Sequence, residues 1–78
     1  MPKVRITKEL TQMDHVRSRL MFYRKRANIR QKDIADNAGI SQQAYSLMER
    51  GKRRLDMEVF FTAINTIGIT PDEFMKGV

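Results

Sequence analysis

The segment from Ile29 to Gly51 constrains the fold of this chain more than any other part of the sequence. Residues 31–38 carry apolar side chains at the spacing of one helix face, and Gly39 follows, where a glycine can end a helix in the left-handed conformation. Ser41 is a good N-cap for a second helix over residues 42–50. A tight turn sets two short helices at a steep angle, which is how a protein can place one of them in a DNA major groove.

Three further helices are predicted around this segment. Apolar residues recur at steps of three and four over residues 11–27 and again over Met57–Ile67. The sequence Thr-Pro-Asp-Glu at residues 70–73 is a start signal for a short fifth helix, with a capping box between its first and last residues. The residues expected to face the core are Met13, Val16, Leu20, Tyr23, Ala27, Ile34, Ala35, Ala38, Tyr45, Met48, Met57, Phe60, Ala63, Ile64, Ile67 and Phe74. No strand pattern is present, so we predict an all-α domain of five helices.

Composition narrows the class of protein further. The chain has 78 residues, of which 41% are hydrophobic, and this fits one small folded domain, which we expect over residues 11–78. Residues 1–10 carry Pro2 and mixed charge and are expected to form a basic N-terminal arm. The absence of cysteine excludes disulfides and cysteine-based zinc sites and favours a reducing compartment, and we therefore expect a cytoplasmic protein. The sequence has no apolar run long enough to span a membrane and no signal-peptide pattern at its N-terminus.

Positive charge is concentrated in two parts of the chain. The sequence has 15 Lys and Arg residues against 9 Asp and Glu residues, for a net charge of +6. The first basic block comprises Lys3, Arg5, Lys8, Arg17, Arg19, Arg24, Lys25, Arg26 and Arg30, and the second comprises Arg50, Lys52, Arg53 and Arg54. Blocks of basic charge suggest a polyanionic partner, although a solvated surface would carry the same charge. A membrane surface fits less well, because the basic segments lack a strong apolar face of Trp or Phe.

Six residues stand at a characteristic joint spacing: Arg24, Gln31, Ala35, Gly39, Glu49 and Gly51. This spacing resembles that of the lambdoid phage repressor and Cro-like helix-turn-helix domains, the XRE family, and the resemblance covers about residues 13–76. It implies a five-helix lambda-repressor-like fold that binds double-stranded operator DNA in a prokaryotic or phage-infected cell, in association with the nucleoid. Two positions depart from the family pattern. Arg30 stands where Ser or Thr usually caps the second helix, and Leu47 is apolar where the residue is usually polar.

The resemblance and the chemistry of the side chains together give candidate DNA contacts. The candidates for base contacts are Gln42, Gln43, Ser46 and Leu47, and those for phosphate contacts are Gln31, Ser41, Arg50, Lys52, Arg53 and Arg54. A glutamine can form two hydrogen bonds with the edge of an adenine, whereas Leu47 could pack on a thymine methyl group. Lys and Arg neutralise phosphates and contribute affinity rather than sequence choice. Outside this motif the same glutamines would be ordinary polar residues on a solvated helix, and Leu47 could also fill the core or form a dimer contact.

The resemblance further implies a partly buried ion pair between Arg24 and Glu49, with a structural role. No catalytic, metal or cofactor site is expected, and no small-molecule ligand is evident. His15 is the only histidine, and Asp33 and Asp36 are interpreted as surface charges because no nucleophile or desolvated pocket accompanies them. The protein is therefore not expected to be an enzyme.

The predicted function is a sequence-specific transcriptional regulator, most simply a repressor that binds an inverted repeat as a homodimer. Phage Cro or short repressor, restriction–modification controller and antitoxin all remain open. The dimer surface is expected in the fourth and fifth helices, around Phe61, Ile69 and Met75, and the arm could lie on DNA or reach the second subunit. Two other functions also remain open: a protein-interaction module that uses the Gln42–Leu47 face, and a non-specific nucleic-acid binder. Against a non-specific binder of single strands, the sequence does not indicate the exposed aromatic residues that stack on bases in such proteins.

Overall fold

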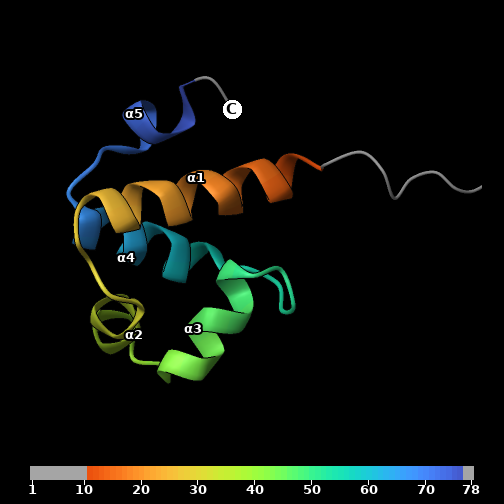
Figure 1. Cartoon of the computed structure of the whole chain (residues 1–78), viewed down its shortest axis with the longest axis vertical. Helices are drawn as coiled ribbons and strands as arrows, with labels where there is room; N and C mark the ends of the chain where they lie inside the picture. Colours follow the sequence, from red (N-terminus) through yellow and green to blue (C-terminus); the bar gives the residue numbers. More distant parts are fainter. Residues whose placement is uncertain (1–10, 77–78) are drawn as a thin grey trace, which may run out of the picture.

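The computed structural model describes residues 11–76, which form five α-helices and contain no β-strand (Figure 1). These helices are α1 (Gln12–Arg26), α2 (Gln31–Ala38), α3 (Gln42–Glu49), α4 (Met57–Ile67) and α5 (Pro71–Met75). The predicted all-α, five-helix fold is confirmed. Two helices differ from their predicted bounds. Helix α1 is shorter by one residue at each end, because Thr11 and Ala27 are its caps, and α3 ends one residue early, because Arg50 is its C-cap. The basic arm predicted over residues 1–10 lies outside the described residues.

Short polar side chains determine where four of the helices begin. Thr11 caps α1, and the Ser41 hydroxyl oxygen accepts a hydrogen bond of 3.0 Å from the Ala44 amide at the start of α3. Asp56 and Thr70 cap α4 and α5 in the same way. The capping box predicted for α5 forms only in part. The Thr70 hydroxyl oxygen accepts from the Glu73 amide. The reciprocal bond, from the Thr70 amide to the Glu73 carboxylate, is not found within residues 11–76.

The start of α2 is stabilised differently, because its N-cap residue is Arg30 and a guanidinium group cannot accept a hydrogen bond. The Asp33 carboxylate accepts from the Arg30 backbone amide at 2.9 Å and also forms an ion pair with the Arg30 side chain, Nη2 to Oδ1, at 2.8 Å. The hydrogen bonds from Arg30 lower the pKa of Asp33 below its ordinary value. The Asp33 carboxylate in the first turn thus satisfies the N-cap amide, whereas the Arg30 side chain caps none of the first-turn amides.

The turn between α2 and α3 fixes the relative direction of these two helices. Gly39 adopts a left-handed conformation, with φ of +73°. The Ile40 amide donates to the Ala35 carbonyl at 3.0 Å, and this bond closes the C-terminal end of α2 after Ala38. As a result, α2 and α3 lie together at one end of the molecule, with α5 at the other end (Figure 1).

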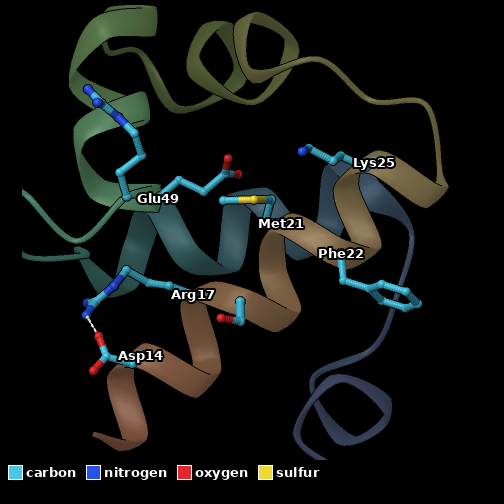
Figure 2. Close-up of a pocket in the computed structure, with 8 residues that line it drawn as sticks. Asp14, Arg17, Met21, Phe22, Lys25 and Glu49 are labelled. Carbon is cyan, nitrogen blue, oxygen red and sulfur yellow. Dashed lines mark hydrogen bonds and ion pairs between the residues drawn. The ribbon is translucent and has the colours of Figure 1, made fainter. Parts of the chain in front are cut away.

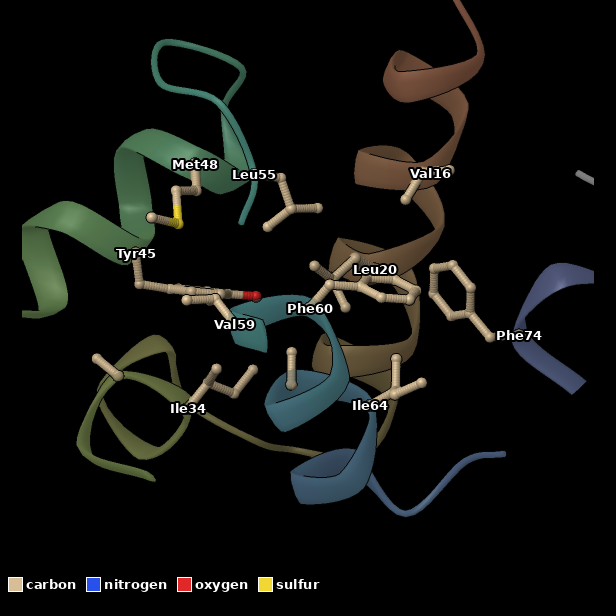
Figure 3. Close-up of a cluster of buried hydrophobic side chains, with 12 residues drawn as sticks. Val16, Leu20, Ile34, Tyr45, Met48, Leu55, Val59, Phe60, Ile64 and Phe74 are labelled. Carbon is tan, nitrogen blue, oxygen red and sulfur yellow. The ribbon is translucent and has the colours of Figure 1, made fainter. Parts of the chain in front are cut away.

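One hydrophobic core holds the five helices together (Figure 3). Its fully buried apolar members are Leu20, Ile34, Ala35, Tyr45, Ala63, Ile64 and Phe74. Helix α2 packs against α3 and α4, and α1 packs across the same two helices. The ring of Phe74 from α5 meets the ring of Phe60 edge-on, with centroids 5.1 Å apart, and so closes the end of the core.

Three residues that the apolar pattern assigned to the core are exposed instead. Met13 and Met57 are 40% and 60% exposed, and Ala27 is also exposed. Both methionines lie in the first turn of their helices, where few neighbours remain to cover them, and Ala27 is the C-cap of α1. The pattern also missed Leu55 and Val59, which are both buried. The inward face of α4 therefore begins at Val59.

Candidate nucleic-acid interface

Helix α3 is held in the domain by one face and exposes the other. Tyr45 and Met48 are buried on its inner side, whereas Gln42 and Gln43 are exposed in its first turn. Ser46 and Leu47 are half-buried. The two glutamine amides are thus available to an external partner, and a helix anchored by large buried side chains can hold them in a fixed orientation.

Glu49, the last residue of α3, carries a carboxylate that is completely buried and fully hydrogen-bonded. Arg24 of α1 binds it at two points, with Nε 2.8 Å from Oε2 and Nη2 3.0 Å from Oε1. The Tyr45 hydroxyl donates to Oε2 at 2.8 Å, and the Gln31 amide nitrogen donates to Oε1 at 3.0 Å. The remaining terminal nitrogen of Arg24 donates to the Ile29 carbonyl at 3.0 Å. A bidentate pair of this kind fixes the angle between helices as well as their distance. The structure thus joins Arg24 and Glu49, and it adds two donors that sequence reasoning missed.

These contacts determine the protonation of the two buried acidic groups. Burial raises the pKa of Glu49, but the hydrogen bonds from Arg24, Gln31 and Tyr45 outweigh burial and leave the pKa below its ordinary value of 4.5. Burial and the adjacent Glu49 charge raise the pKa of the Tyr45 phenol. Tyr45 therefore remains a hydrogen-bond donor and Glu49 remains ionised at neutral pH.

The lowered pKa of Glu49 predicts acid-sensitive folding. The stabilisation is fully present above the unfolded-state pKa, near 4.5, and is lost as the pH falls through the lower folded-state pKa. We expect the free energy of unfolding, measured by urea titration, to fall with decreasing pH below about 4.5. Glu49→Gln should be less stable at neutral pH and show a weaker acid dependence. Asp14 and Asp33, whose pKa values are also lowered, would account for the remaining dependence. Parallel pH profiles for the two proteins would contradict this account.

The predicted phosphate contacts at the start of α2 and α3 have partners within the protein. Gln31 is half-buried, and one hydrogen of its side-chain amide is used by Glu49, so the second hydrogen and the backbone amides of Gln31 and Lys32 remain for an anion. The Ser41 oxygen accepts from Ala44, which leaves its O–H free to donate. Neither interaction blocks a phosphate contact, but both restrict its direction.

The turn after α3 carries the second basic block. Arg50, Lys52, Arg53 and Arg54 are all exposed around Gly51, whose φ of +81° favours glycine. Arg17 of α1 packs against this turn, since a Cβ atom built on Gly51 would lie 3.1 Å from Arg17 Nε. Sequence reasoning did not single out Arg17. The available signal was its position two helical turns before Arg24, on the same face of α1.

Comparison with known families identifies the class of protein that this fold and site define. A family model described as helix-turn-helix matches residues 20–74. The chain therefore belongs to the XRE helix-turn-helix family, the lambda repressor and Cro-like domains, whose members are DNA-binding regulators. This confirms the resemblance seen in the sequence. Searches of curated proteins and of solved structures gave no match.

Within residues 11–76, no helix is long and apolar enough to cross a bilayer. The same residues contain no group of three histidine, aspartate or glutamate side chains placed to hold a metal ion.

Proposed function

We propose that this protein is a transcriptional repressor that acts in the cytoplasm of a prokaryotic or phage-infected cell by binding an operator as a homodimer. Gln42 and Gln43 would read base edges in the major groove, with Ser46 and Leu47 as secondary contacts. The observation that carries this proposal is the exposed pair of glutamines in the first turn of α3, on a helix of the helix-turn-helix motif. The N-terminal residues of such a helix are the ones that reach base edges.

Phosphate contacts would flank the glutamines on both sides. We assign them to Gln31 and Ser41 at the starts of α2 and α3, and to Arg50, Lys52, Arg53 and Arg54 in the turn after α3. The charged residues are exposed, which supports this assignment. Such contacts would position α3 and contribute most of the salt-dependent affinity, whereas the glutamines would contribute the sequence preference.

A homodimer is proposed because one recognition helix covers too few base pairs to select a single genomic site. The surface that supports it is an apolar groove of about 290 Å³, which includes the exposed side chains of Met13, Met57, Phe61 and Met75. Exposed apolar patches of this kind commonly mark protein–protein contacts. Ile69, which we expected on this surface, packs partly against the core and does not line the groove.

Phe61→Ser is expected to weaken self-association and operator binding by about tenfold or more, since a buried aromatic hot spot typically contributes about 2 kcal/mol or more to an interface. Phe61 is 44% exposed, and Phe22, which is 55% exposed and does not line the groove, provides the matched control Phe22→Ser for self-association without DNA. Sedimentation equilibrium in the absence of DNA would measure the effect. Equal dimerisation in the two variants would place the dimer surface elsewhere.

The repressor role can be tested with a reporter gene whose promoter overlaps a bound sequence. Expression of the protein should lower transcription, and Gln42→Ala with Gln43→Ala should restore it. Increased transcription would instead indicate an activator. Repression by the double variant would indicate that other residues read the operator.

A further inference from the structure

A broad cleft lies between α1 and the C-terminal end of α3 (Figure 2). It has a volume of about 630 Å³, and its lining includes Arg17, Met21, Phe22, Lys25, Glu49 and Arg50. Arg17, Met21 and Lys25 follow one another at intervals of four residues on one face of α1. This face opens toward Glu49 at the end of α3, as Figure 2 shows.

The charge of this cleft favours an anion. Its two carboxylates are already neutralised, Asp14 by an ion pair with Arg17 and Glu49 by Arg24. Lys25 and Arg50 form no ion pair within residues 11–76. Four cations, counting Arg24, therefore face two carboxylates, and the surplus lies on side chains that solvent can reach. An anionic ligand that enters the cleft would therefore meet no uncompensated negative charge.

The cleft is continuous with both groups of phosphate contacts proposed above. Arg17 lies against Gly51, in the turn that carries the second basic block. Glu49 connects the cleft to Gln31 at the start of α2 through the hydrogen bond of 3.0 Å. The lining is not purely polar, because Met21 and the half-exposed ring of Phe22 also contribute to it. A ligand that carries an anion beside a less polar group would fit this surface.

We propose that the cleft binds the DNA backbone, with Lys25 and Arg17 each donating to a phosphate at opposite ends of the cleft and the apolar residues between them packing on deoxyribose. The inference rests on the proposed function and extends the DNA interface from α2 and α3 onto α1. Lys25 would contribute an unpaired charge. Arg17 would exchange part of its contact with Asp14 for a phosphate while remaining packed on Gly51.

Lys25→Gln tests this inference most directly, since Lys25 is exposed and makes no hydrogen bond through its side chain within the described residues. Lys76→Gln is the matched control, because it removes the same charge from the end of α5, away from α2 and α3 (Figure 1). Binding to a labelled duplex with the sequence selected by the wild-type protein would be measured over a range of salt concentrations. We expect Lys25→Gln to weaken binding and to reduce the slope of log K against log salt by about 0.9, as for one lost phosphate contact. Lys76→Gln should leave the slope unchanged.

A scan of the same duplex with single methylphosphonate linkages would locate the phosphates. At one linkage the neutral group should weaken wild-type binding but leave Lys25→Gln binding unaffected, because the contact is already lost. Arg17→Gln should respond in the same way at a nearby linkage, with the thermal midpoint checked to confirm that the variant is folded. Equal slopes for Lys25→Gln and Lys76→Gln, or no such linkage, would overturn the inference while leaving the operator-binding proposal intact. Failure of the wild-type protein to prefer any duplex would overturn both.

Discussion

Arg24→Met is expected to lower the free energy of unfolding by about 3–5 kcal/mol, the largest stability effect that we predict for a single substitution. The substitution leaves the Glu49 carboxylate buried with only Tyr45 and Gln31 as donors and with no positive charge beside it. It also removes the hydrogen bond to the Ile29 carbonyl, which helps to hold the connection between α1 and α2. Urea or thermal unfolding followed by circular dichroism would measure the loss.

Arg26→Met is the matched control for this effect. Arg26 is an exposed residue of the last turn of α1, so its replacement should change stability little. The double variant Arg24→Met with Glu49→Met should recover much of the lost stability, because no unpaired charge then remains in the core. Similar unfolding free energies for Arg24→Met and Arg26→Met would show that the ion pair contributes little to folding.

Gln42→Ala combined with Gln43→Ala is expected to remove most of the preference for a selected sequence over a scrambled one. Each glutamine that forms a bidentate contact with a base contributes about 1–3 kcal/mol of discrimination, or roughly fivefold to 150-fold in relative affinity. Binding to the scrambled duplex at low salt should change little, because the basic residues are unaltered. Competition binding with the two duplexes would measure the ratio directly.

The control for this variant is Gln12→Ala, which removes an exposed glutamine from the start of α1. It should retain the full preference. Retention of that preference in the double variant as well would mean that Gln42 and Gln43 do not read the operator. The half-buried Leu47 and the protein-interaction alternative would then need to be considered first.

The helices could be predicted closely from sequence because their start signals are local. Thr11, Ser41, Asp56 and Thr70 each cap a helix through a residue two or three positions away, so the cap and its partner lie in one short segment. The exposure of Met13 and Met57 was not predictable in this way. Apolar spacing defines a helix face, but the extent of its cover depends on how far the neighbouring helices reach.

The candidate site was only partly accessible to sequence reasoning for the same reason. The family spacing placed Arg24 opposite Glu49, but Tyr45 of α3 and Gln31 of α2 also donate to this carboxylate. The four-residue spacing of Tyr45 and Glu49 is the available signal for the first contact. Nothing in the residue spacing indicates the second contact, which comes from another helix. The contact between Arg17 and Gly51 is also long-range in sequence. It depends on the packing of α1 against the turn after α3, which local sequence patterns do not specify.

Sequence-specific binding by a homodimer can be tested by selecting bound sequences from a random duplex DNA library at low and at near-physiological salt. We expect an enriched inverted repeat that persists at the higher salt, with half-site centres about one helical turn apart. Adenine at positions within each half-site would agree with contacts from Gln42 and Gln43. Enrichment of no sequence, with binding lost as salt rises, would contradict the account and leave the positive charge of the domain as the sole basis of its DNA binding.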